Sequence, residues 1–267
     1  MRLLIVLLLA TVVTSIGCTR SADHSAVFDG TAGVWIDLTY AFSEETVYWP
    51  TGMPFSHEEV AYGPSEAGHF YSSYNYSANE QGGTHFDAPI HFAEGGSTAE
   101  QIPINSLVGP AVVVDVTASA HPDYQVQVSD LERWEQAHGQ IPDGAQVLFL
   151  TGWGSRWPDK ASFLGTDMTG PDAVPHLHFP GISPEAARWL ANQRNIDAVG
   201  IDTPSIDYGQ STQFETHVIL YEAGIIGYEN IANLDQLPEQ GAFVIALPMK
   251  IAGGSGGPLR IIGFVPN

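Results

Sequence analysis

The 267-residue sequence predicts a single α/β domain with a mixed sheet. Short apolar runs rich in β-branched residues recur along the chain, and segments with helix start signals lie between several of them. No segment repeats at a fixed period, which argues against a repeat protein. Hydrophobic residues make up 44% of the chain, which is enough to bury a sizeable core in one unit.

Residues 1–17 are interpreted as an export signal, because Arg2 precedes the apolar run Leu3–Val13, which is too short to span a bilayer comfortably. Cys18 follows in a pattern that resembles the bacterial lipobox, except for a serine where leucine is usual. The alternative is an ordinary signal peptide with an incidental cysteine. We expect an exported protein, periplasmic or lipid-anchored to the bacterial envelope through Cys18, with residues 18–33 as a tether.

Residues 34–267 are expected to form the folded domain. Six apolar runs in it are predicted to be strands: Val34–Thr39, Ala111–Val116, Val147–Thr151, Ala198–Asp202, Phe243–Leu247 and Ile261–Val265. Most of them are near-continuous apolar stretches, and such stretches suit strands that are covered on both faces.

Three segments are predicted to be helices: Ser129–His138, Ser183–Arg194 and about 213–223. Ser183 and Pro184 provide an N-cap and a favourable first helical residue, and Gly224 can end the last helix in the left-handed conformation. Long segments rich in glycine, proline and serine, at 50–82 and 152–182, are expected to be loops that form walls of a site.

The charge balance excludes several classes of function. The chain has 30 acidic and 9 basic residues, a formal net charge of -21. Binding to nucleic acid needs lysine and arginine to displace counterions from phosphates, so we expect no nucleic-acid partner. The same charge argues against docking on anionic lipid, which leaves only the possible lipid on Cys18. One cysteine excludes a disulfide framework and a cysteine-based zinc site.

The segment from Gln81 to His91 is the most informative part of the sequence. In an extended segment, side chains alternate, so His85 and Asp87 point to the same face. An imidazole beside a carboxylate makes half of a divalent-metal site. Pro89 stops the extended segment, and His91 then lies close enough to contact the same cavity. The alternative is three polar residues on a solvated loop.

A second pair of residues supports a metal site. His217 lies among apolar residues on the third predicted helix, and Glu229 follows 12 residues later. A buried histidine and a buried carboxylate must be paired or bound to a metal, because an unpaired buried charge costs several kcal/mol. The alternative is a structural salt bridge between the two side chains.

Together these segments resemble the cyclase family of metal-dependent hydrolases, which includes kynurenine formamidase and isatin hydrolase. The family pattern His-x-Gly-Thr-His-x-Asp-x-Pro-x-His is matched from Gly83 to His91. The resemblance continues through Phe179–Leu190, Gly200–Asp207, His217, Glu229–Asp235 and Lys250–Arg260, so it spans nearly the whole domain.

The resemblance implies hydrolysis of an amide or cyclic amide on a swivelling β/β/α fold, with a small molecule as the substrate and a dimer or tetramer as the assembly. His85 and Asp87 match family metal ligands, and His91 matches the histidine assigned to proton transfer. His217 and Glu229 match a distal pair that completes a second metal site or lies beside a single one. A bound divalent ion lowers the pKa of its water to about 7 and polarises a carbonyl.

The sequence departs from the family at Gln81, which stands where the pattern has its first histidine. The glutamine carbonyl is a harder and weaker donor toward zinc than imidazole. We therefore expect one ion per chain, Mn2+ or Zn2+, with Gln81 as a candidate ligand. Glu80 or His69 could serve in its place. The alternative is a degenerate site in a ligand-binding envelope lipoprotein.

Aromatic residues could wall a pocket for a flat ring. Trp153 and Phe86 are candidate substrate contacts, and Arg156 could meet a substrate carboxylate. Trp157, Phe70, Tyr71 and Tyr74 are further candidates for this wall. The alternative is that these aromatic side chains pack loops onto the domain. Because export fits poorly with intracellular tryptophan catabolism, we expect an environmental lactam, lactone or amide as the substrate.

Overall fold

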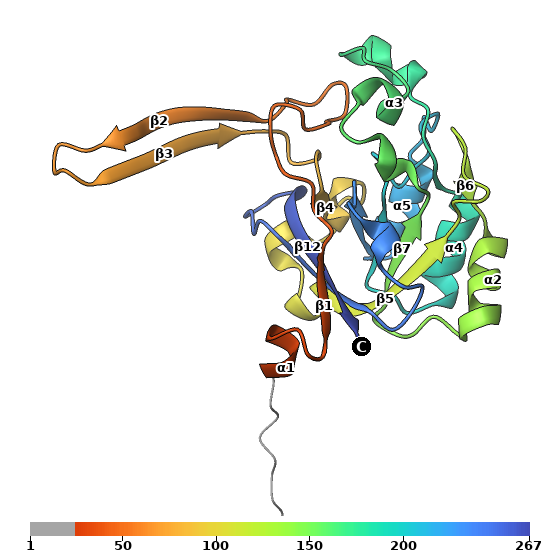
Figure 1. The fold of residues 1–267 in the computed structure, drawn as a ribbon. Coiled ribbons are helices and arrows are strands. Elements are labelled where there is room, and N and C mark those ends of the chain that lie inside the picture. Colours follow the sequence, from red (N-terminus) through yellow and green to blue (C-terminus); the bar gives the residue numbers. More distant parts are fainter. Residues whose placement is uncertain (1–24) are drawn as a thin grey trace, which may run out of the picture.

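The computed structural model describes residues 25–267, so the expected signal at 1–17 and Cys18 lie outside the described residues. An eight-stranded mixed sheet forms its centre, in the order β1-β12-β11-β5-β7-β9-β10-β4. The strands are β1 (Gly33–Asp37), β4 (His85–Asp87), β5 (Val108–Asp115), β7 (Gln146–Leu150), β9 (Ala198–Ile201), β10 (Ile226–Glu229), β11 (Phe243–Pro248) and β12 (Gly256–Pro266). The predicted α/β domain with a mixed sheet is confirmed (Figure 1).

The sheet closes on itself into a barrel-like arrangement, because β4 pairs with β12 as well as with β10. Strands β5, β7, β9 and β10 are parallel neighbours, whereas β1, β12, β11 and β4 pair antiparallel. β1 and β12 place Gly33 opposite Pro266. All six predicted strands belong to this sheet. β12 begins earlier than expected, because Gly256 and Gly257 pair with β4 although glycine has little strand propensity.

Both faces of the central strands are buried, as their continuous apolar runs predict. In β5, Ala111 and Val113 belong to a cluster enclosed by the closed sheet. Val112 and Val114 point to the other face, where they pack in a cluster with residues of the helices. The core therefore has two layers, one inside the sheet and one between sheet and helices.

The predicted helices cover the parallel half of the sheet. They are α2 (Val128–His138), α4 (Pro184–Gln193) and α5 (Glu215–Glu222). The Ser183 hydroxyl accepts a hydrogen bond from the Ala186 amide at 3.1 Å, which confirms the predicted N-cap. Smaller elements are α1 (Ser25–Phe28), α3 (Lys160–Leu164), the paired strands β6 (Gln125–Val126) and β8 (Gly181–Ile182), and 3₁₀ turns at Pro89–His91, Ala99–Gln101, Ile104–Leu107, Trp153–Arg156, Pro171–His176 and Leu234–Gln236.

The segment 50–82 is not the loop that its composition predicts. It contains a hairpin of β2 (Ser56–Pro64) and β3 (Phe70–Ser77), which projects from the body of the domain (Figure 1). Most of its side chains are exposed on both faces. The pattern of one apolar and one polar face, which identifies a strand packed on a core, is therefore absent from this segment.

The described part of the chain begins at Ser25 with α1, which packs beside β1. The Trp35 indole donates a hydrogen bond to the Val27 carbonyl at 3.0 Å, which holds α1 against β1. Among the described residues, no helix is both long and apolar enough to cross a membrane.

Phe86, a candidate substrate contact, lies in the core of the domain. It lies between His85 and Asp87 in β4, so strand alternation turns its side chain to the opposite face. There it is fully buried in the cluster inside the sheet. Sequence proximity to the motif does not place a side chain on the motif's face.

We predict that Phe86→Ala lowers the free energy of unfolding by about 3–5 kcal/mol, because it leaves a cavity inside the closed sheet. Denaturant unfolding of the purified protein measures this. Phe28→Ala is the matched control, since Phe28 is 79% exposed and its truncation should change stability by no more than about 0.5 kcal/mol. An unchanged unfolding midpoint for Phe86→Ala would contradict the core assignment.

Candidate metal centre

Strand register brings the first three polar side chains of the site together. Glu229 of β10 lies directly opposite His85 of β4, and Gly227 lies opposite Asp87. On the other side of β4, Gly256 of β12 lies opposite Asp87. Directly paired residues project to the same face of a sheet, so His85, Asp87 and Glu229 share one face. Glycine on both sides of Asp87 leaves space around its carboxylate.

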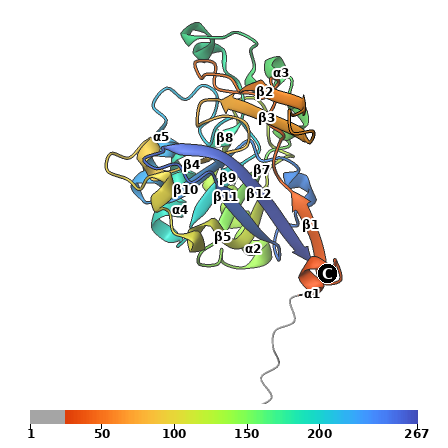
Figure 2. The same ribbon diagram turned by 90° about the vertical axis from the view of Figure 1, so that its left-hand side faces the viewer.

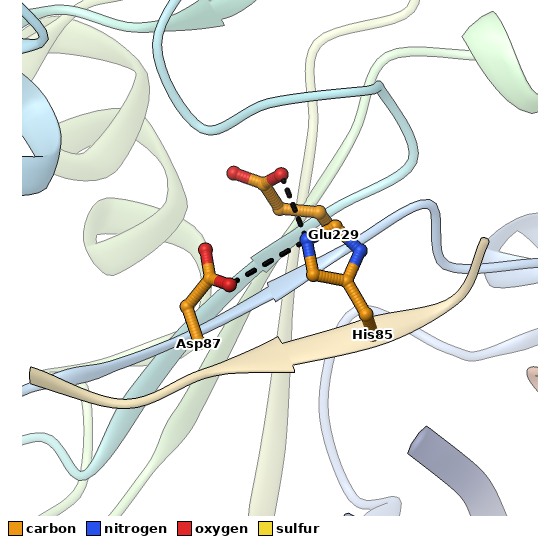
Figure 3. Close-up of side chains that lie close together, drawn as sticks. All are labelled: His85, Asp87 and Glu229. Carbon is orange, nitrogen blue, oxygen red and sulfur yellow. Dashed lines mark ion pairs between the residues drawn. The ribbon is translucent and has the colours of Figure 1, made fainter. Parts of the chain in front are cut away.

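The three side chains converge (Figure 3). His85 Nε2 lies 3.5 Å from Asp87 Oδ1 and 3.3 Å from Glu229 Oε2. All three residues are buried, and one ligand atom from each lies within 4.8 Å of the others. Within residues 25–267, His85 Nε2 and Asp87 Oδ1 have no hydrogen-bond partner. Two ligand atoms about 2.1 Å from a metal ion at a tetrahedral angle are about 3.4 Å apart, so this set fits a divalent cation.

His217 adds a fourth group from α5. Its Nε2 lies 3.2 Å from Glu229 Oε1 and 3.7 Å from Asp87 Oδ2. Its Nδ1 lies 2.6 Å from Asp207 Oδ2, and Asp207 also accepts the His217 backbone N–H at 3.1 Å. A carboxylate on Nδ1 fixes the proton there and turns the Nε2 lone pair toward the cluster. The carbonyl of Gly83 does the same for His85, at 2.9 Å from its Nδ1.

Tyr221 of α5 supports Asp87, and sequence reasoning assigned it no role. Its hydroxyl donates a hydrogen bond to Asp87 Oδ2 at 3.0 Å. Burial and the charge of Asp87 raise the pKa of Tyr221 well above its ordinary value, so the hydroxyl remains a donor. Gly227 provides the space, because a Cβ at that position would lie 2.2 Å from the Tyr221 hydroxyl. Asp207 was likewise missed, since only its place in a family motif marked it.

Protons and a cation compete for the buried cluster. Burial opposes every charge there, but the interactions among the charged groups outweigh it. The pKa of His85 rises to about 9 through Asp87 and Glu229, although burial alone would lower it. The pKa of His217 also rises well above its ordinary value, because its ring interacts with Asp207 and Asp87. The pKa values of Asp87 and Glu229 are lowered by the two histidines. Without a cation, the carboxylates are therefore neutralised by imidazolium groups.

The cluster opens on a cavity of about 270 Å³. Its polar lining includes Gln81, His85, His91, His217 and Glu229, and its apolar lining includes Val47, Tyr48, Trp49, Phe92 and Phe214. His91 is half-buried. Burial lowers its pKa more than Asp87 raises it, so the ring is neutral at pH 7 and can accept a proton.

Gln81 lies at the cavity, whereas its two possible substitutes do not contribute to it. The Gln81 amide donates to Ser255 Oγ at 2.9 Å. Glu80 accepts hydrogen bonds from the Ser255 amide and hydroxyl, at 2.9 and 2.8 Å, and is not among the residues that line the cavity. His69 lies at the turn of the projecting hairpin and is exposed. Gln81 is the one of the three that could complete the ligand set.

Two further candidate substrate contacts lie elsewhere. Trp153 is buried in a separate cluster, where its indole donates to the Phe163 carbonyl at 2.8 Å. The Arg156 guanidinium stacks 3.6 Å from the centre of the Trp153 ring. Neither residue is among those that line the cavity. The hairpin aromatics Phe70, Tyr71 and Tyr74 are also absent from its wall, which is built from Tyr48, Trp49, Phe92 and Phe214 instead.

Known proteins are similar to this chain in sequence. The model of the family described as "Putative cyclase" matches residues 36–208. Isatin hydrolase of Roseibium aggregatum is 34% identical over 198 residues, which cover 70% of this chain and 73% of that protein. Kynurenine formamidase of Salinibacter ruber is 32% identical over 233 residues, which cover 85% of this chain and 95% of that protein.

Solved structures of other proteins have a similar fold. Isatin hydrolase A from Ralstonia solanacearum has a TM-score of 0.81 at 36% identity, and the alignment covers 96% of this chain and all of that one. An isatin hydrolase bound to the product analogue thioisatinate has a TM-score of 0.80 at 29% identity, covering 91% of this chain and 96% of that chain.

We predict that Tyr221→Phe weakens divalent-cation binding about 10- to 100-fold, because Asp87 loses the group that orients it. Gly227→Ala should do the same, since its methyl group displaces the Tyr221 hydroxyl. Titration against a chelator measures the affinity. Tyr228→Phe is the matched control, because that hydroxyl binds Gln146 and not the cluster. Wild-type affinity in Tyr221→Phe would contradict the positioning role.

We also predict that cation binding releases protons at pH 7. The raised pKa of His85, about 9, means that the ring is protonated below that pH in the cation-free protein. The apparent affinity should therefore rise with pH by about tenfold per unit for each proton displaced, up to about pH 9. Calorimetry in two buffers of different ionisation enthalpy counts the protons. Binding without proton release between pH 6 and pH 8 would contradict the charge assignment.

Proposed function

The chain belongs to the cyclase family of metal-dependent hydrolases, and we propose that it hydrolyses the C–N bond of a cyclic amide or an aryl formamide. The observation that carries this proposal is the buried cluster of His85, Asp87 and Glu229 beside a cavity, in which His85 Nε2 and Asp87 Oδ1 have no hydrogen-bond partner among the described residues. Ring opening of a lactam is the preferred reaction, because three of the similar solved structures are isatin hydrolases, one of them with a product analogue bound.

His85, Asp87 and Glu229 would hold one divalent ion per chain, with His217 and Gln81 beside them. Such an ion supplies Lewis acidity, which lowers the pKa of a water molecule and polarises a carbonyl. The donors are imidazole nitrogens, carboxylate oxygens and an amide, with no sulfur, and this mixture suits Mn2+ at least as well as Zn2+. Asp207 and Gly83 orient the two histidines through their Nδ1 atoms.

His91 would carry the proton in this reaction. His91 lines the same cavity, and the centre of its imidazole ring lies 6.1 Å from the centre of the His217 ring. Its lowered pKa keeps the ring neutral near pH 7, so it can take a proton from the attacking water. It would then return that proton to the departing nitrogen. The aromatic rings of Trp49 and Phe214 offer an apolar wall to a flat substrate.

A catalytically degenerate binding protein is not favoured, because the proposed ligand set and proton carrier meet at one cavity. We propose that the enzyme is exported, periplasmic or anchored through Cys18, as the pattern of residues 1–17 indicates. Its substrate would then be an environmental lactam, lactone or amide. We also propose that it assembles as a homo-oligomer, either a dimer or a tetramer.

The test combines elemental analysis with hydrolysis of isatin and N-formylkynurenine after Mn2+ or Zn2+ is added. We expect about one ion per chain in the wild type. His91→Ala should keep the ion but turn over about 100- to 10,000-fold more slowly, because only proton transfer is lost. Asp87→Ala should lose both ion and activity.

The exposed His121 provides the control variant His121→Ala, which should match the wild type in both measurements. Stoichiometric metal without hydrolysis of any lactam, lactone or formamide would overturn the proposal and favour a binding protein. Wild-type turnover in His91→Ala would remove His91 as the proton carrier.

A further inference from the structure

Gln81 is a cavity residue whose side chain has two ends of the same shape and opposite chemistry. The oxygen of its amide group accepts hydrogen bonds and can bind a cation, whereas the nitrogen carries two hydrogens and cannot. Shape alone therefore does not determine which end of the amide faces a cation. A neighbouring group that makes a directed hydrogen bond has to determine it.

Ser255 holds the nitrogen end of this amide. Its hydroxyl oxygen lies 2.9 Å from Gln81 Nε2. The Ser255 backbone is fixed on both sides, because its carbonyl accepts the Ala88 N–H at 2.9 Å and its own N–H donates to Glu80 Oε2 at 2.9 Å. Ser255 directly precedes β12, which begins beside β4 (Figure 2). The serine is therefore fixed relative to the strand that carries two of the candidate ligands.

Glu80 determines the direction of the hydrogen bond between Ser255 and Gln81. A serine hydroxyl has one proton and two lone pairs. The proton of the Ser255 hydroxyl is directed at Glu80 Oε2, at 2.8 Å, and this oxygen also accepts the Ser255 backbone N–H. Only the lone pairs of Ser255 Oγ then face Gln81. Gln81 must therefore turn its N–H end toward the serine and its oxygen away from it.

Gly256 lets the Gln81 amide lie beside Asp87. A Cβ at Gly256 would lie 2.9 Å from Gln81 Nε2 and 3.2 Å from Asp87 Oδ1, so the two side chains border the same small space. The hydrogen bonds of Gln81 to other side chains use its backbone N–H and its Nε2, and Oε1 has none within the described part of the chain. The carbonyl oxygen is thus available to a ligand at the cavity.

We propose that Glu80 and Ser255 are positioning residues, which turn the carbonyl oxygen of Gln81 toward the bound cation. This inference rests on the proposed function, because it requires the buried cluster to hold a divalent ion. Carbonyl oxygen suits Mn2+, whereas imidazole nitrogen suits Zn2+. The orientation of Gln81 therefore raises the affinity for Mn2+ relative to that for Zn2+.

The test is a double-mutant cycle on cation affinity, in which the cation-free protein is titrated with Mn2+ and with Zn2+ against a chelator. Ser255→Ala should weaken Mn2+ binding about 10- to 100-fold, as is typical when a group that orients a ligand is lost, and Zn2+ binding less. In the Gln81→Leu background, Ser255→Ala should have no further effect, because no amide is left to orient. Ser155→Ala is the matched control, since that hydroxyl donates to the Gly152 carbonyl at 2.8 Å and does not line the cavity.

Two variants at Glu80 separate the direction of the hydrogen bond from the effect of charge. Glu80→Gln keeps an oxygen that accepts both Ser255 donors, and its lost charge acts equally on two ions of the same charge. The ratio of Mn2+ to Zn2+ affinity should therefore equal that of the wild type. Glu80→Met has no strong acceptor, so the Ser255 proton can turn to Gln81 and the amide can reverse. The ratio should then fall as in Ser255→Ala, and the unfolding midpoint shows that each variant is folded.

Additive effects of Ser255→Ala and Gln81→Leu would overturn the proposal, because the serine would then act independently of Gln81. Equal ratios of Mn2+ to Zn2+ affinity in Glu80→Gln and Glu80→Met would overturn it as well. A wild type that binds no divalent ion would overturn the proposed function together with this inference. A wild type that binds the ion but hydrolyses no substrate would overturn the proposed function alone, since the cycle measures affinity and not turnover.

Discussion

Strand β4 joins the two halves of the sheet with three residues, and each of the three is paired on both sides. The hydrogen bonds of this short strand bring β10, from the parallel half, next to β12, from the antiparallel half. Phe86 fills the interior that the closure creates, while its neighbours His85 and Asp87 face α5. The same three residues therefore seal the core with one face and supply two candidate ligands with the other. A chain that failed to close the sheet would lose the site with it.

The buried charges explain why so much of the surrounding structure is polar and ordered. Asp87, Asp207 and Glu229 are buried with only His85 and His217 to balance them. Every carboxylate has a defined donor, such as Tyr221 for Asp87 and the Ile206 amide for Glu229 at 2.8 Å. Groups that are partly satisfied in this way cost free energy unless a further positive charge is present. The arrangement stabilises the fold best when a cation completes it.

Local patterns predicted the parts of the site that depend on local geometry. His85 and Asp87 share a face because strand side chains alternate, and six strands follow from their apolar runs. The position of Glu229 opposite His85 depends on register between segments more than 140 residues apart, and the sequence alone does not determine that register. Asp207 and Tyr221 act through other side chains, so no spacing rule identifies them.

The places of the aromatic side chains have physical reasons of the same kind. Trp153 and Phe86 are aromatic candidates for a substrate wall, and in the structure both fill hydrophobic clusters, as many aromatic side chains do. The glycine, proline and serine content of residues 50–82 predicts a loop, and the hairpin of β2 and β3 that forms there has no buried face that would identify it as a pair of strands. Long-range strand pairing is not encoded in any short window of sequence.

The pairing of β1 with β12 brings the first and last strands of the sheet together. Gly33 and Pro266 are neighbours across two antiparallel strands, so the start and end of the barrel lie side by side. A short linker between them would make the backbone a ring, and a new start could then be cut at the exposed turn near Gly68. Such a circular permutant would keep every strand neighbour, including both partners of β4. The site depends on which strands touch, and not on where the polypeptide begins.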